Sequence, residues 1–207
     1  MSLAIRSGWC LARRVCCAFY CANLFFVDAP ALAQIVTKRG ATIDQRGPVK
    51  SLLEIRSEGL VLQNWDMSCG AAALLTVLKY RFGVNLTERF VADAMLRSGD
   101  REAIRRQGGF SFLDMKRFAG SIGFQARGIG LSTPADIASH PHAIVPVLEI
   151  GRLPHFIVVR SAAQNGDLDV ADPAFGNRAI PLERFRAIWE PKVALVIEKK
   201  QPASEMK

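Results

Sequence analysis

The amino-acid sequence predicts an α+β fold, in which helices from the first part of the domain pack against an antiparallel sheet formed by the second part. Apolar residues recur at helical spacing between residues 69 and 122. Beyond Pro134, short stretches rich in β-branched residues alternate with Gly, Pro and Asn. Because the helices come first and the strands follow, we expect the two kinds of element to segregate, as they do in α+β domains.

The chain of 207 residues is predicted to have four segments. Residues 1–33 are predicted to be a signal peptide, because Arg13 and Arg14 precede an apolar stretch and Ala31-Leu32-Ala33 matches a cleavage site. An uncleaved N-terminal membrane anchor is the alternative. The rest is predicted to be a polar lead-in (34–58), one folded domain (59–199) and a flexible tail (200–207). We therefore expect an exported protein, periplasmic or secreted.

Three helices are expected before the strands. The first begins near Cys69 and ends at Gly83, a residue type that commonly stops a helix. The second, TERFVADAML, begins at Thr87. The third is capped by Ser111, and one of its faces is apolar, with Phe112, Met115, Phe118 and Ile122.

Four strands are expected after the helices. Their sequences are AIVPVLEI (143–150), HFIVVRSA (155–162), DLDVAD (167–172) and VALVIEK (193–199). Gly, Pro and Asn separate them, and turns of this composition suit strands that run antiparallel.

The charge of the chain is moderately basic. The formal net charge of +8 becomes +6 when residues 1–33, with three arginines and one aspartate, are removed. The densest basic stretch is RSGDREAIRRQGG, where Arg97, Arg101 and Arg105 recur every four residues. This stripe could meet an anionic surface, but a solvated helix face is the preferred interpretation. Nucleic-acid binding is not expected, because no aromatic residues are interleaved with these charges and no known motif is present.

Cys69 is the last of five cysteines. The other four lie in the predicted signal peptide, so cleavage would leave a lone thiol that cannot form an intramolecular disulfide. Such a thiol is either a buried small apolar residue or a reactive group. At the start of a helix, unpaired backbone N–H groups and the positive end of the helix dipole favour a thiolate.

A cysteine nucleophile requires a base, and the base requires an orienting group. Of the three histidines, His140 and His142 lie in a turn that contains proline, whereas His155 opens a predicted strand. Asp172 ends the next strand, so a hairpin could place it beside His155. Taken singly, His155 could be an ordinary strand-end histidine and Asp172 an ordinary turn-starting residue.

Together these residues resemble the motifs of the C39 cysteine peptidases, papain-like enzymes best known as N-terminal domains of bacteriocin-exporting ABC transporters. The motif Q-x5-C-G-x-A is matched from Gln63 to Ala72, and G-x-[ST]-x-x-[DE]-[LM] is matched at 109–115. The strand motif H-[FY]-[IV]-V followed by D-P-A-x-G is matched from His155 and from Asp172. One departure is Ser68, at a position where members often carry aspartate. The resemblance extends over residues 61–197.

The resemblance implies a papain-like fold and a thiol peptidase. It implies that Cys69 is the nucleophile, His155 the general base and later acid, and Asp172 the group that orients the imidazole. Gln63 would donate to the oxyanion together with the backbone N–H of Cys69. The implied substrate is an exported polypeptide, cleaved after small residues such as Gly-Gly. Two alternatives stay open: a non-hydrolytic peptide-binding module for secretion or assembly of a surface structure, and acyl transfer or amide hydrolysis on a non-protein substrate.

The chain also departs from the transporters in lacking the P-loop pattern G-x-x-x-x-G-K-[ST] and any multi-span region. We therefore expect a stand-alone member without an ATP site. Similar stand-alone proteins are associated in Gram-negative bacteria with secretion or assembly of surface structures such as amyloid fibres, which suggests a partner in secretion machinery. No cofactor or metal is expected, because His140 and His142 alone make a poor zinc site.

Overall fold

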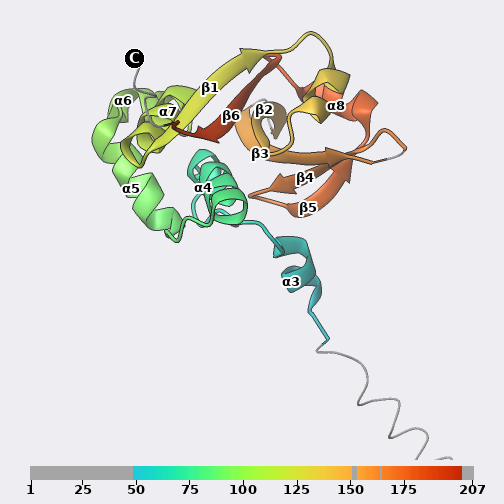
Figure 1. Cartoon of the computed structure of the whole chain (residues 1–207), viewed down its shortest axis with the longest axis horizontal. Coiled ribbons are helices and arrows are strands. Elements are labelled where there is room, and N and C mark those ends of the chain that lie inside the picture. The colour runs from blue at the N-terminus through green and yellow to red at the C-terminus, as the bar shows by residue number, and fades with distance from the viewer. Residues whose placement is uncertain (1–48, 151–152, 164, 202–207) are drawn as a thin grey trace, which may run out of the picture. The chain divides into compact units, whose positions relative to one another are not determined.

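The computed structural model describes residues 49–150, 153–163 and 165–201. The predicted signal peptide, residues 34–48 of the predicted lead-in and residues 202–207 of the predicted tail lie outside the described residues. The described residues contain a six-stranded sheet in the order β1-β6-β2-β3-β4-β5, and every pair of neighbours is antiparallel. Helices precede most of the strands and pack beside the sheet (Figure 1), which confirms the α+β prediction.

The three predicted helices are present as α4 (Cys69–Phe82), α5 (Glu88–Ser98) and α7 (Phe112–Ser121). Gly83 ends α4 in the left-handed conformation with φ 74°, and Thr87 caps α5 through its side chain. Ser111 caps α7 and forms a capping box with Asp114. Local capping chemistry therefore sets the bounds of these helices much as the sequence predicts.

The predicted strands are also present. β2 (Ala143–Ile150) and β6 (Val193–Lys199) have the predicted bounds, whereas β3 (Leu153–Ala162) begins two residues earlier and β4 (Leu168–Asp172) one residue later than predicted. β3 and β4 pair as an antiparallel hairpin in which Val158 lies opposite Ala171. This hairpin brings the first residues of β3 near the last residue of β4.

Six further elements were not predicted: α3 (Leu52–Ser57), α6 (Arg101–Gln107), β1 (Phe124–Gly130), η1 (Pro134–Ser139), β5 (Gly176–Ile180) and α8 (Leu182–Ile188). Each has only five to seven residues, and such short elements show too little periodicity to be recognised. α3 lies in the segment predicted to be a polar lead-in, and Leu52, Leu53 and Ile55 of this helix are exposed.

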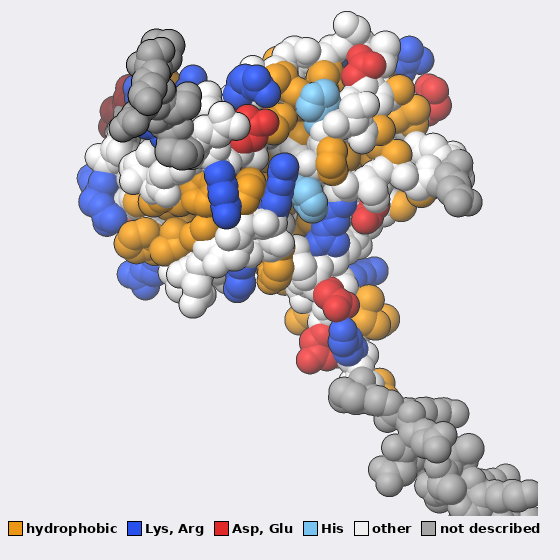
Figure 2. Space-filling model, in the orientation of Figure 1, with side chains coloured by type: hydrophobic (Ala, Val, Ile, Leu, Met, Phe, Trp, Pro, Cys, Tyr) orange, Lys and Arg blue, Asp and Glu red, His pale blue; other side chains and the backbone are white. Residues whose placement is uncertain are grey.

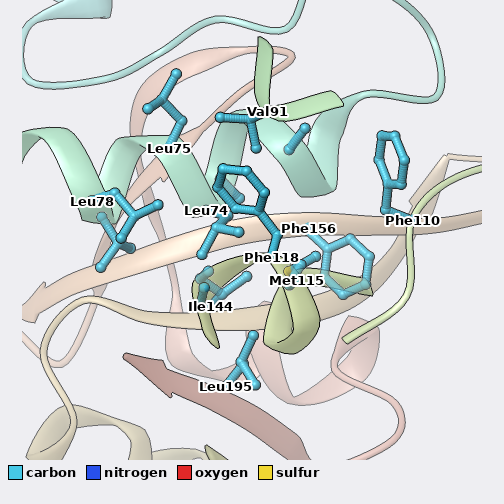
Figure 3. Close-up of a cluster of buried hydrophobic side chains, with 14 of the residues drawn as sticks. Leu74, Leu75, Leu78, Val91, Phe110, Met115, Phe118, Ile144, Phe156 and Leu195 are labelled. Carbon is cyan, nitrogen blue, oxygen red and sulfur yellow. The ribbon is translucent and has the colours of Figure 1, made fainter. Parts of the chain in front are cut away.

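Two apolar cores lie on the two faces of the sheet. The first joins α4, α5 and α7 to one sheet face, and Figure 3 shows helix residues such as Leu74, Val91 and Phe118 beside Ile144 and Leu195 of the strands. The second lies on the other face, under α8, and includes Val145, Ile157, Val170, Phe185 and Trp189. Successive strand residues alternate between the two cores, as the pleat requires. Because the first ten residues of α4 are all buried, the start of this helix is held firmly.

Gly70, the second residue of α4, permits close packing at the helix start. A Cβ atom at this position would lie 2.7 Å from Cε of Met115 and 3.3 Å from Cβ of Phe110. We expect Gly70→Ala to lower the free energy of unfolding by about 1–3 kcal/mol, because the added methyl group overpacks the core. Urea unfolding measures this change.

The matched control is Gly120→Ala in α7, where an added Cβ would have no neighbour within 4 Å. This change should raise the free energy of unfolding by about 0.5–1 kcal/mol, because alanine favours helix more than glycine does. If Gly70→Ala were as stabilising as Gly120→Ala, the overpacking argument would be wrong.

Candidate active site

Cys69 is the first residue of α4 and is only 4% exposed. It is a free cysteine. The backbone N–H groups of the first helical turn have no partner within the helix, and they give this end a partial positive charge. The predicted position of the thiol at a helix start is therefore confirmed.

The loop that leads into Cys69 is held by a buried carboxylate from another helix. Glu88, in the first turn of α5, is 5% exposed. Its Oε1 atom lies 2.5 Å from Oγ of Ser68 and accepts a hydrogen bond of 3.0 Å from the backbone N–H of Asn64. The carboxylate also accepts a hydrogen bond from the side-chain amide of Asn64. Ser68, where relatives were expected to carry aspartate, thus contacts a carboxylate that the sequence analysis did not identify.

His155 and Asp172 form a buried pair on neighbouring strands. Nε2 of His155 lies 2.7 Å from Oδ1 of Asp172, and the two residues are 6% and 0% exposed. Oδ1 also accepts hydrogen bonds from the backbone N–H groups of Ala174 (2.9 Å) and Phe175 (3.2 Å). The structure therefore brings these two predicted site residues together through the expected hairpin.

The thiol of Cys69 also influences the imidazole of His155. Burial disfavours the imidazolium, but the hydrogen bonds to Asp172 and Cys69 and the negative charges of both groups raise the pKa of His155 from 6.5 to about 9. Because Nε2 is bonded to Asp172, Nδ1 is the ring nitrogen left for the thiol. Burial also opposes ionisation of Asp172, but its hydrogen bond to His155 and the charge of that ring hold the pKa of this carboxyl below its usual value. The arrangement favours an imidazolium between the sulfur and the carboxylate.

Arg178 binds the second oxygen of Asp172. Its Nε and Nη2 atoms donate to Oδ2 over 3.1 Å and 2.8 Å. Arg178 also donates two hydrogen bonds to Glu149, which accepts a further one of 2.6 Å from Arg184. Alternating charges therefore extend from His155 through Asp172 to Arg184, and Arg178 binds the carboxylate oxygen that the imidazole does not use.

Arg178 and Glu149 were not predicted from the sequence. The D-P-A-x-G turn reverses the chain after Asp172, and β5 then returns beside β4 with Arg178 opposite Val170. The position of Arg178 soon after this turn could have been noticed as a hint. Glu149 lies on β2, and nothing near it in the sequence indicates a partner at position 178.

Gln63 lies beside the turn that follows Asp172. Its backbone N–H donates to the carbonyl oxygen of Pro173 over 2.9 Å, and its Nε2 atom donates to the carbonyl oxygen of Trp65 over 3.2 Å. Its Oε1 atom is buried without a hydrogen-bond partner among the described residues. The amide thus donates within its own loop in this structure, and its oxyanion role stays a prediction.

Cys69 lies on the wall of a pocket of about 510 Å³. Apolar and aromatic side chains make most of this wall, among them Phe110, Phe112, Phe156, Pro146, Pro154 and Pro191. The rings of Phe112 and Phe156 lie 5.2 Å apart. The thiol therefore lines a pocket with a largely apolar wall.

A sequence model described as "Peptidase C39 family" matches residues 57–202. The chain belongs to the peptidase C39 family. The resemblance noted from Gln63, Cys69, His155 and Asp172 is thereby confirmed at the level of the family, and the protein is a cysteine-type peptidase.

Two relatives of this C39 peptidase are each named "Probable functional amyloid protease FapD". The protein from Pseudomonas fluorescens is 37% identical over 158 residues, which cover 76% of this chain and 68% of the relative. The protein from Pseudomonas aeruginosa is 39% identical over 149 residues, which cover 72% of this chain and 65% of the relative. The chain thus spans about two thirds of the length of these relatives.

Solved structures show the same fold. One is the peptidase domain of Streptococcus ComA, which is described as a bi-functional ABC transporter involved in a quorum sensing pathway. It superposes with a TM-score of 0.57 at 26% identity, and the match covers 69% of this chain and 98% of that domain. A double glycine motif protease from an AMS/PCAT transporter, in complex with the leader peptide, superposes with a TM-score of 0.55 at 22% identity. The match covers 68% of this chain and 91% of that protein. The expected papain-like C39 architecture is confirmed by these likenesses.

The remaining histidines of this C39 peptidase lie elsewhere. His140 follows η1, where its Nδ1 atom lies 3.2 Å from the carbonyl oxygen of Asp136, and His142 precedes β2. Burial, together with the charges of Arg81 and Arg160, lowers the pKa of His142. Within the described part of the chain, no three His, Cys, Asp or Glu side chains are grouped to hold a metal ion.

None of the helices in the described ranges has the length and apolar character needed to cross a membrane. The predicted signal peptide, and with it the alternative of an N-terminal anchor, falls on residues 1–33, outside the described residues.

Proposed function

We propose that this C39 peptidase hydrolyses peptide bonds of an exported polypeptide, after small residues such as Gly-Gly, with Cys69 as nucleophile. The observation that supports the proposal is the position of the thiol. Cys69 lies at a helix start and lines an apolar pocket, and it helps to raise the pKa of His155 in the buried His155–Asp172 pair. Nucleophile, base and orienting group are thus grouped together, as nucleophilic catalysis requires.

In the proposed reaction the thiolate of Cys69 attacks the carbonyl carbon of the scissile bond. The negative charge that develops on the carbonyl oxygen is stabilised by the backbone N–H of Cys69 and by the side-chain amide of Gln63, once that amide turns from Trp65 toward the oxygen. The imidazolium of His155 then donates its proton to the leaving amine, which leaves a thioester. His155 next removes a proton from water, the resulting hydroxide attacks the thioester, and the carboxylic acid product departs as the thiolate is restored.

Three features support a peptide substrate, and the second of them also favours small residues. The pocket beside Cys69 is lined by Phe110, Phe112 and Phe156, and apolar walls of this kind can bind a polypeptide segment. A protease of the same fold was solved with a leader peptide, and it is described as a double glycine motif protease. Two relatives are named as amyloid proteases. The signal peptide predicted at residues 1–33 would place the chain in the periplasm or outside the cell, where an exported polypeptide and a partner in secretion machinery would meet it.

The rate at which iodoacetamide alkylates Cys69 tests the proposal. It should be followed against pH on the full chain, with Cys69 resolved from the other cysteines by mass spectrometry. We expect rapid alkylation below pH 7, because the imidazolium of His155 stabilises the thiolate. This reactivity should disappear in His155→Ala and persist in the control His142→Ala. Slow alkylation that follows an ordinary thiol titration in the unmodified chain would contradict the proposed pair and favour the non-hydrolytic binding module.

A further inference from the structure

Arg97, Arg101 and Arg105 are brought together by two helices rather than by one. The sequence alone favours the solvated face of a helix for this stripe. The structure instead ends α5 at Ser98 and begins α6 at Arg101, with Gly99 and Asp100 between them. All three arginines line one pocket of about 580 Å³, which we call the basic pocket.

The guanidinium groups of the basic pocket have few partners among the described residues. Arg101 donates through Nε to the carbonyl oxygen of Leu96 over 3.3 Å, and Arg105 makes a 3.4 Å contact with Glu102 in which both side chains are about 70% exposed. The acidic residue that lines the pocket, Asp93, lies 3.9 Å from Arg89. Surface pairs of this length contribute little, so three positive charges remain available to an anionic ligand.

The basic pocket also has an apolar part. Met67, Leu96 and Ile104 line it; Ile104 is 3% exposed and belongs to the core, whereas Met67 is 44% exposed. Figure 2 shows basic and hydrophobic side chains side by side over the part of the surface that Figure 1 assigns to α5. Cationic groups around an apolar floor fit a peptide in which acidic residues alternate with apolar ones.

The basic pocket adjoins the pocket that contains the thiol. Met67 lies two residues before Cys69 in the chain. Gly109 lines the Cys69 pocket and packs against Met67 so closely that an added Cβ would lie 3.2 Å from its carbonyl oxygen. Arg106 lines the Cys69 pocket, while its neighbour Arg105 lines the basic pocket. Residues that line the two pockets thus lie close together, and we take the two pockets as parts of one polypeptide-binding surface.

We propose that the basic pocket is an exosite that binds an acidic segment of the polypeptide substrate. The inference rests on the proposed function, since it assumes that a polypeptide occupies the Cys69 pocket. A carboxylate matches the fork of a guanidinium, which can donate two parallel hydrogen bonds to it. A peptide can enter a concave pocket and reach its apolar floor, whereas the plane of a lipid headgroup layer meets only the exposed rim.

The test measures binding separately from cleavage. The full chain with Cys69→Ala is titrated against a rhodamine-labelled peptide of alternating Glu and Leu, and binding is followed by fluorescence anisotropy. A peptide with Gln in place of every Glu is the ligand control. We expect the Glu peptide to bind more tightly, and its affinity to fall as salt is added, because the pairs are partly exposed to solvent.

Arg97→Gln/Arg101→Gln/Arg105→Gln, made in the same Cys69→Ala chain, should weaken binding of the Glu peptide by about tenfold. A matched control removes the same charge from exposed positions on α4 and α7, with Lys79→Gln/Lys116→Gln/Arg117→Gln, and should leave the affinity within about twofold. The proposal would be overturned if the two triple variants lost affinity for the Glu peptide equally, or if the Glu and Gln peptides bound equally tightly. Arginine-dependent binding to phosphatidylglycerol vesicles without binding of the peptide would also overturn it.

Failure of the exosite proposal can be distinguished from failure of the proposed peptidase function. Cleavage of a peptide library by the unmodified chain reports on the proposed function, and the anisotropy titration reports on the basic pocket alone. In the otherwise unmodified enzyme, the arginine triple variant should raise KM for acidic peptides and leave kcat unchanged, because Arg97, Arg101 and Arg105 do not line the Cys69 pocket. A lower kcat with unchanged KM would contradict the exosite.

Discussion

Cys69→Ala is expected to lower kcat/KM for peptide cleavage by roughly 10⁴-fold or more, because the variant loses the atom that attacks the carbonyl carbon. The buried thiol is small, and an alanine in its place keeps the start of α4 intact. The free energy of unfolding should therefore change by only about 1 kcal/mol. Single-turnover cleavage of a fluorogenic peptide and urea unfolding measure the two effects.

The same measurement on His155→Ala distinguishes a catalytic pair from two independent residues. Residues that act as a unit give losses that do not add, so Cys69→Ala/His155→Ala should be no slower than Cys69→Ala alone. Ser121→Ala, which removes a hydroxyl that bonds only to the Phe118 carbonyl oxygen within α7, is the control. Substantial cleavage by Cys69→Ala would mean that another group attacks the peptide, and the role proposed for the thiol would be wrong.

Asp172→Asn should have the second largest effect, and it should change both rate and stability. Asp172 is fully buried and accepts hydrogen bonds from His155, Arg178 and two backbone N–H groups. Removing its charge leaves the cations of His155 and Arg178 without their shared partner. We expect a loss of roughly 10³–10⁴ in kcat, because the imidazole loses its orientation. We also expect a loss of about 3–5 kcal/mol in the free energy of unfolding, because a buried ion pair is broken.

The pH dependence of the reaction follows from the raised pKa of His155. With a folded pKa of about 9, the imidazolium persists at neutral pH and is lost as the pH rises through about 9, so cleavage should decline there. The stability that the charged imidazole contributes should be fully present below pH 6.5 and should be lost over the same rise toward pH 9. In Asp172→Asn the decline should begin at lower pH, because the carboxylate no longer favours the charged ring.

A pH–rate profile and urea unfolding at several pH values measure these shifts. Asp169→Asn is the matched control, since Asp169 lies on the same strand and in the same pairing ladder but takes no part in the contacts of His155. It should keep the alkaline limb near pH 9. An alkaline limb that stays in place in Asp172→Asn would show that Asp172 does not set the charge of the imidazole.

Several parts of the fold could be predicted from the sequence because they depend on local interactions. The bounds of α4 follow from a stretch of apolar residues that ends at a left-handed glycine, and α5 and α7 follow from side-chain caps at Thr87 and Ser111. The strand stretches follow from β-branched residues between turn-forming ones. The triad could be proposed because Cys69 begins α4, Asp172 ends β4 and His155 lies near the start of β3, where the side chain of each is held in a definite direction.

Other features of the site depend on contacts between residues far apart in the chain, and only the tertiary structure reveals them. The ion pair of Arg178 with Glu149 spans 29 positions, and the hydrogen bond of Ser68 to Glu88 spans 20. The basic pocket exists because the break at Gly99 and Asp100 folds α6 against α5 and carries three arginines around Met67. Helix periods, caps and turns are properties of a few neighbouring residues, so the sequence alone determines them. The partner of a buried charge depends on which strands and helices pack together. That packing is determined only when the whole chain folds and buries its apolar residues, so it cannot be deduced from neighbouring residues.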